Sequence, residues 1–113
     1  MIVNFVFEIP PNTTQKTLLR EVEVPAGLVT KAHVNIPPGW NYTAGVRVEA
    51  SGKQILPTYG DDYISGNGLD VTLEPMELVT AGKLQLYGIN HDPDNPHGGV
   101  IILEFVPLSE MGW

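Results

Sequence analysis

The chain has 113 residues, of which 42% are hydrophobic, and its formal net charge is −7 from 13 acidic and 6 basic side chains. This length predicts one domain, residues 1–108 with a short tail at 109–113, that is large enough to bury a core of its own. The basic residues are scattered and no segment approaches the roughly 20 apolar residues of a membrane helix, so we expect neither nucleic-acid binding nor membrane insertion.

Hydrophobic and polar residues alternate in short runs from one end of the chain to the other. Because successive side chains of a strand point to opposite faces, this period of two predicts half-buried strands, and no run keeps the 3.6-residue period of a helix. In chain order, we expect strands at residues 2–9, 18–25, 28–36, 43–51, 53–57, 68–74, 82–90 and 100–107, with a short strand or a turn at 77–81.

Segments rich in proline, glycine and asparagine separate these runs. They are expected to be loops, chiefly at 10–14, 37–42, 59–67 and 91–99. Seven or eight short strands with such loops predict an all-β fold, an antiparallel β-sandwich of jelly-roll-like type.

The inward side of each strand is expected to form the core. In the third strand the alternation places Thr30 inside, in line with Ala32, and in the fourth it places Arg47 and Glu49 outside. The expected core consists of Phe5, Phe7, Val22, Val24, Val34, Ile36, Val46, Val48, Leu69, Val71, Leu84, Leu86, Ile101, Leu103 and Phe105.

Catalytic motifs do not stand out. The chain lacks cysteine, a Gly-x-Ser-x-Gly elbow and a phosphate-binding glycine loop, and its three histidines, at 33, 91 and 97, have no recognisable serine partner. We therefore expect a protein that is not an enzyme and needs no cofactor. The absence of cysteine also favours folding inside a cell.

The loop from His91 to His97 contains residue types that bind metal ions: His91, Asp92, Asp94, Asn95 and His97. Calcium would take the oxygens and zinc the imidazoles. The spacing matches no known metal-binding loop, and the same residue types are common in turns, so we favour a solvated turn over a metal site.

Aromatic residues lie in two of the expected loops, Trp40 and Tyr42 in one and Tyr59 and Tyr63 in the other. Displayed aromatics can stack on sugar rings, as in carbohydrate-binding modules. Alternatively Trp40 closes one end of the core, which we favour because tryptophan is highly buried on average. Trp113 either folds back on its domain or anchors to a neighbouring subunit, since interfaces favour tryptophan.

The order of the loop motifs resembles that of small structural proteins encoded by phages and proviruses. Ile9 to Thr14 reads Ile-Pro-Pro-Asn-Thr-Thr; a Val-Thr-Lys strand at 29–31 leads to Pro-Pro-Gly at 37–39; and a Gly-x-Gln-Ile-x-Pro hairpin spans 52–57. A Gly-Asp-Asp segment at 60–62 and an Asn-x-Asp loop at 90–92 follow, with His97 before the last strand. The similarity spans nearly the whole chain.

This resemblance implies a virion structural protein that is folded in the host cytoplasm. A capsid decoration (cement) protein, which stabilises the shell across subunit junctions, is favoured over a tail accessory protein. Its expected partners are the major capsid protein or another virion protein and further copies of itself, a trimer being favoured. The alternatives are a carbohydrate-binding module and, with less support, a metal-dependent enzyme. The interface candidates are Pro10, Pro11, Trp40, Tyr42, Tyr59, Asp61, Asp62, Tyr63 and Trp113.

Overall fold

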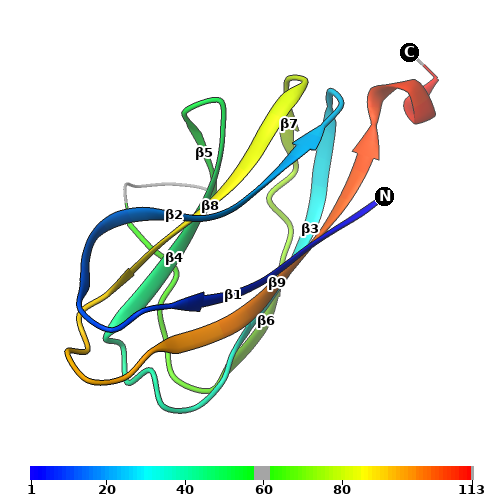
Figure 1. The fold of residues 1–113 in the computed structure, drawn as a ribbon. Helices are drawn as coiled ribbons and strands as arrows, with labels where there is room; N and C mark the ends of the chain where they lie inside the picture. Colours follow the sequence, from blue (N-terminus) through cyan, green and yellow to red (C-terminus); the bar gives the residue numbers. More distant parts are fainter. Residues whose placement is uncertain (58–61, 113) are drawn as a thin grey trace.

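The computed structural model describes residues 1–57 and 62–112 (Figure 1). The described residues form nine strands: β1 (Ile2–Ile9), β2 (Thr13–Val24), β3 (Gly27–Ile36), β4 (Ala44–Ala50), β5 (Lys53–Leu56), β6 (Leu69–Leu73), β7 (Glu77–Val79), β8 (Gly82–Asn90) and β9 (His97–Pro107). A short 3-10 helix, η1 (Leu108–Met111), follows β9 where the sequence predicts a tail. No helix in this part of the chain is long and apolar enough to cross a membrane.

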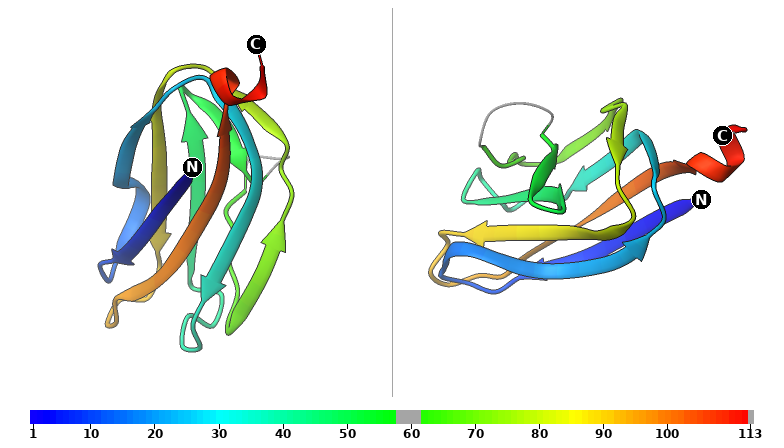
Figure 2. Two further views of the ribbon diagram at one scale, coloured as in Figure 1. Left: turned by 90° about the vertical axis from the view of Figure 1, so that its right-hand side faces the viewer. Right: turned by 90° about the horizontal axis from the view of Figure 1, so that it is seen from above.

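The strands form two antiparallel sheets that pack face to face, which confirms the predicted β-sandwich (Figure 2). The first sheet has the order β1-β9-β3-β6, with β7 also paired to β3, and the second has the order β2-β8-β4-β5. If β7 is set aside, the pairing is nested: the first strand pairs with the last, the second with the second-last, the third with the sixth and the fourth with the fifth.

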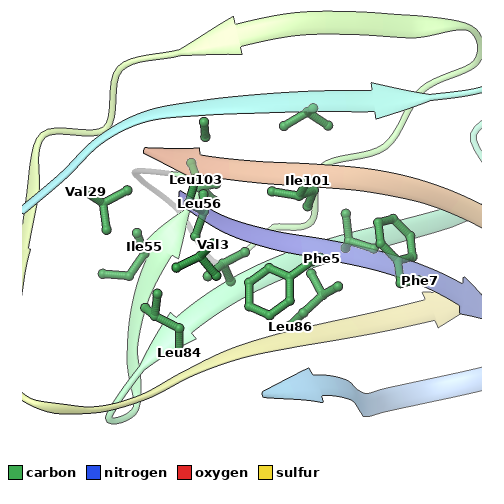
Figure 3. Packing of buried hydrophobic residues seen from close by; sticks show 14 of the residues in the cluster. Val3, Phe5, Phe7, Val29, Ile55, Leu56, Leu84, Leu86, Ile101 and Leu103 are labelled. Atoms are coloured by element: carbon green, nitrogen blue, oxygen red, sulfur yellow. The ribbon is translucent and has the colours of Figure 1, made fainter. Parts of the chain in front are cut away.

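The core lies between the sheets and contains residues from both (Figure 3). β1 shows the expected alternation, with Val3, Phe5, Phe7 and Ile9 buried and the residues between them exposed. Twelve of the fifteen expected core residues are buried; the other three, Val22, Leu69 and Val71, pack against the core but are only partly buried. They lie on β2 and β6, which are edge strands with a neighbouring strand on one side only.

The third strand departs from strict alternation at Thr30. The register between β3 and β9 shifts between Val29 and Lys31, so Thr30 is an extra residue opposite the β9 strand. Val29 is fully buried, whereas Thr30 is half-buried and its hydroxyl donates to the carbonyl of Glu104 at 3.2 Å. The prediction that Thr30 faces the core is therefore wrong, because a β-bulge changes the face of every residue before it.

Two further differences have similar causes. β2 begins at Thr13, inside the predicted loop 10–14 and before the expected start at residue 18. The register of β2 against β8 shifts twice, and each shift interrupts the alternation of hydrophobic and polar residues from which the strand was predicted. Ile55 and Leu56 are both fully buried beside a register shift between β4 and β5, although neither is among the expected core residues.

The outer face of β4 is covered rather than exposed. All seven residues of this strand are buried, including Arg47 and Glu49, which are 8% and 5% exposed. Ile64 forms an isolated bridge with Val46, and the Tyr63 ring lies 5.4 Å from the Arg47 guanidinium carbon. As the alternation predicts, Arg47 and Glu49 lie on the outer face, but both are buried there, because the Tyr63 ring packs against Arg47 and Lys16 of β2 lies 2.6 Å from the Glu49 carboxylate.

Candidate interaction surface at the loop end

Loops from both sheets converge at one end of the sandwich, below the labels of β1 and β6 in Figure 1. Backbone hydrogen bonds join them: the Asn12 amide donates to the Asp92 carbonyl at 2.8 Å, and the His91 amide donates to the Thr43 carbonyl at 2.8 Å. We call this surface the loop end, and it comprises residues 10–12, 37–43, 65–68 and 91–96.

The buried side chain of Asn90 connects two of these loops. Asn90 ends β8 and is 0% exposed. Its Nδ2 lies 3.2 Å from the carbonyl oxygens of both Ile9 and Pro10 and 2.9 Å from that of Asn95, while its Oδ1 accepts the Asp92 amide at 2.9 Å. One amide thus satisfies backbone groups of the 10–12 and 91–96 loops, which fixes their relative position.

The Asp92 carboxylate organises the 91–96 loop. Its Oδ1 accepts the backbone amides of Asp94 at 2.9 Å and Asn95 at 3.2 Å, and its Oδ2 lies 3.0 Å from Nε2 of His97. These contacts, the Asp94 amide first, lower the pKa of Asp92 from 3.8 to about 2. The arrangement is an Asx turn closed by a histidine.

Apart from His97, the other candidate metal ligands bring no imidazole or oxygen to the Asp92 carboxylate. His91 is exposed, and Asn95 places its amide nitrogen, not its oxygen, 3.4 Å from the Asp92 carboxylate. Across residues 1–57 and 62–112, no three His, Cys, Asp or Glu side chains are grouped so that they could hold a metal ion.

Trp40 is buried beneath the loop end and only 1% exposed. Its Nε1 donates to the Gly98 carbonyl at 3.0 Å, and its ring packs edge-on against Phe7 with centroids 6.2 Å apart. The interpretation of Trp40 as the closing residue of the core is confirmed. Its place among the interface candidates is wrong, because a buried indole has no face free for a partner.

Tyr42, two residues further on, has the opposite environment. It is 76% exposed, which makes it the most exposed large hydrophobic residue among those described. Both Asn41 and Tyr42 have a left-handed backbone, with φ of 48° and 63°. Residues with a side chain adopt this conformation at a cost, so the surrounding contacts must hold it in place.

Those contacts come from the segment before β6. The Tyr42 amide donates to the Gly66 carbonyl at 3.2 Å, and Oδ1 of Asn67 accepts the amides of Gly39 at 2.8 Å and Asn41 at 3.3 Å. With Pro37 and Pro38 at the start of the loop, the backbone that carries Tyr42 is restrained along most of its length. Tyr42 is therefore displayed on a rigid support.

The remaining interface candidates differ in their surroundings. Pro10, Pro11 and Asp62 are exposed. Tyr63 is half-buried, and its Cβ and ring lie against Gly45 and Arg47 on the outer face of β4. Tyr59, Asp61 and Trp113 lie outside the described residues.

Sequence reasoning missed the two asparagines that support this surface. Asn90 and Asn67 act through long-range contacts, from Asn90 to Ile9 and from Asn67 to Gly39. A single sequence holds no signal for such contacts, because asparagine before a turn is common whether or not its amide reaches another loop.

Comparison with known proteins gives no relative: the chain matches no family model, no curated protein and no solved structure.

Proposed function

We propose that this protein is a non-enzymatic virion structural protein, a capsid decoration (cement) protein that binds a viral shell through its loop end. The observation that carries the proposal is Tyr42, which is 76% exposed on a loop whose backbone is held by Asn67 and Gly66. The nested strand pairing supports it, because such pairing is typical of jelly rolls, an architecture used in viral capsids and also in lectins.

A rigidly displayed tyrosine suits a binding surface. Tyrosine is enriched among the residues that dominate binding energy, and it can bury a large ring while its hydroxyl keeps a hydrogen bond. A loop that is ordered before binding loses little conformational entropy on association. Tyr42 is therefore the expected anchor, and the exposed prolines of the loop end belong to the same surface.

The charge of the loop end indicates what kind of surface it would meet. Its residues include Asp92 and Asp94 but no lysine or arginine. Together with the net charge of −7, this favours a neutral or basic partner surface, such as a patch across a junction of capsid subunits. A protein that binds the assembled shell but not its separate subunits stabilises the shell by mass action, and no catalytic reaction is needed.

The carbohydrate-binding alternative has less support than the decoration proposal. A sugar ring needs an open aromatic face, and Trp40 is buried while Tyr63 is half-buried beside Arg47. Among the described tyrosines and tryptophans of the two expected loops, this leaves Tyr42 as the one that is fully displayed.

The test has two stages. Mass spectrometry of particles purified from the source should detect the protein at a fixed ratio to the major capsid protein. Particles depleted of it should then rebind the purified protein, and Tyr42→Ala should weaken rebinding at least tenfold. Leu78→Ala is the matched control, because Leu78 is 53% exposed on β7, away from the loop end. Absence from the particles, or rebinding of Tyr42→Ala at the wild-type level, would overturn the proposal.

A further inference from the structure

We propose that β1 is a pairing edge, at which two copies of the chain join antiparallel through their β1 strands to form a twofold dimer. This inference is independent of the proposed decoration function. It rests on the contrast between β1 and the other sheet edges, on the direction of its backbone groups and on the self-complementary order of its residues.

The other sheet edges are short or irregular. β5, β6 and β7 have four, five and three residues, and β2 has two register shifts along its pairing with β8. β2 also carries the charged residues Lys16, Arg20, Glu21 and Glu23. Short length, bulges and charges are the usual means by which proteins protect sheet edges from other strands.

β1 has only two such protections, its own charge Glu8 and the Arg20 side chain of β2, which bonds the Val6 carbonyl. It pairs with β9 over eight consecutive residues, Ile2 to Ile9, without a register shift. It contains no proline or lysine. A long, regular strand with few charges at a sheet edge presents a template for another strand.

The backbone groups of β1 that do not pair with β9 belong to its even-numbered residues. Met1 exchanges hydrogen bonds with Phe105 on β9, so the odd-numbered residues in register with β9 direct their groups toward that strand. Ile2, Asn4, Val6 and Glu8 therefore direct their N–H and C=O groups away from the sheet. A side-chain hydrogen bond supports this direction of the even-numbered groups: Nε of Arg20, on β2, donates to the Val6 carbonyl at 3.1 Å.

The side chains of the same residues are exposed. Ile2 and Val6 are 61% and 58% exposed, whereas Val3, Phe5 and Phe7 are buried in the core. A second strand at this edge would therefore cover two large apolar side chains without disturbing the core.

The order of these residues is self-complementary. With the twofold axis at Asn4, Ile2 lies opposite Val6 of the second copy, and the two Asn4 amides lie opposite each other, where each can donate and accept. With the axis at Val6, the two Val6 side chains meet and Asn4 lies opposite Glu8 of the second copy. Both registers place apolar beside apolar and polar beside polar, so a second copy of β1 fits this edge.

Arg20 opposes the pairing. In both registers the Val6 carbonyl accepts a backbone amide from the second copy, and it must first lose its bond to Arg20. Arg20 thus weakens the dimer without preventing it, and its removal should strengthen the association.

Sedimentation analysis from about 1 μM to 1 mM tests the proposal. The wild-type protein should show a monomer–dimer equilibrium, Val6→Lys should weaken it at least tenfold, and Arg20→Ala should tighten it several-fold. Leu78→Lys, which adds the same charge at an exposed residue of β7, should leave it unchanged. Circular dichroism checks that each variant is folded.

Cysteine crosslinking identifies the strand and its register. The chain has no cysteine, so a single Asn4→Cys or Val6→Cys variant can form a disulfide only between copies. One of the two should crosslink efficiently in mild oxidant and Leu78→Cys should not. A monomer at all concentrations, a trimer, or a dimer that Val6→Lys leaves intact would overturn the pairing, and none of these results would bear on whether the protein binds a shell.

Discussion

The indole Nε1 of Trp40 donates a hydrogen bond to the carbonyl oxygen of Gly98 at 3.0 Å, and this bond joins the β3–β4 loop to the start of β9. Because Trp40 is fixed in the core, the chain must turn sharply through Asn41 before it enters β4 at Ala44. The turn directs Tyr42 outward. The buried tryptophan and the displayed tyrosine are therefore two consequences of one loop geometry.

Trp40→Phe should lower the free energy of unfolding by about 2–4 kcal/mol. The smaller ring leaves a cavity beside Phe7 and removes the donor for the half-buried Gly98 carbonyl. Urea unfolding measures this loss. The control is Tyr42→Phe, which removes a hydroxyl from an exposed side chain and should change stability by no more than about 0.5 kcal/mol. Wild-type stability in Trp40→Phe would contradict the role assigned to this residue.

Asn67→Ala should loosen the loop that carries Tyr42 at a small cost in overall stability, about 1 kcal/mol, because two backbone amides lose their acceptor. Limited proteolysis should then cut within residues 37–43 faster than in the wild type. Asn67→Asp retains an acceptor oxygen and should restore protection. Equal cleavage of all three proteins would show that Asn67 does not brace the loop.

Asp92→Asn should remove a pH-dependent part of the stability. The pKa of Asp92 is lowered from 3.8 to about 2, so its stabilising contribution is complete above about pH 4 and disappears as the pH falls toward 2. The melting temperature of the wild type should exceed that of Asp92→Asn at neutral pH, and the gap should narrow between pH 4 and pH 2. Asp94→Asn, a change at an exposed neighbour, is the control and should leave the melting temperature at neutral pH close to that of the wild type. A gap that stays constant down to pH 2 would argue against the Asx turn as its source.

Gly27→Ala should destabilise the fold by about 1–3 kcal/mol, because a Cβ at this position would lie 2.5 Å from the Val106 carbonyl oxygen and also meet the Phe105 ring. Thermal unfolding followed by circular dichroism measures the effect. Gly66→Ala is the comparison, since its added Cβ would approach only the Leu69 side chain, at 3.3 Å, and should cost less. If the two variants melt together, the packing of β3 against β9 is looser than the distances indicate.

The sequence by itself determined the strands whose contacts are regular. β1 and β8 have the bounds that the alternation predicts. In a strand without a bulge, odd-numbered and even-numbered residues point to opposite faces throughout, so the pattern of polarity can be read directly. The same reasoning placed most of the core and the turn around Asp92, since turn residues act on the backbone next to them.

The tertiary structure decided everything that depends on a distant part of the chain. The bulge at Thr30 arises from the register with β9, and Glu49 is buried on the outer face of the second sheet, with its carboxylate 2.6 Å from Lys16 of β2. Asn90 acquires its role only when Ile9 lies beside it. Such contacts join residues tens of positions apart, and no local pattern of polarity records which of them meet.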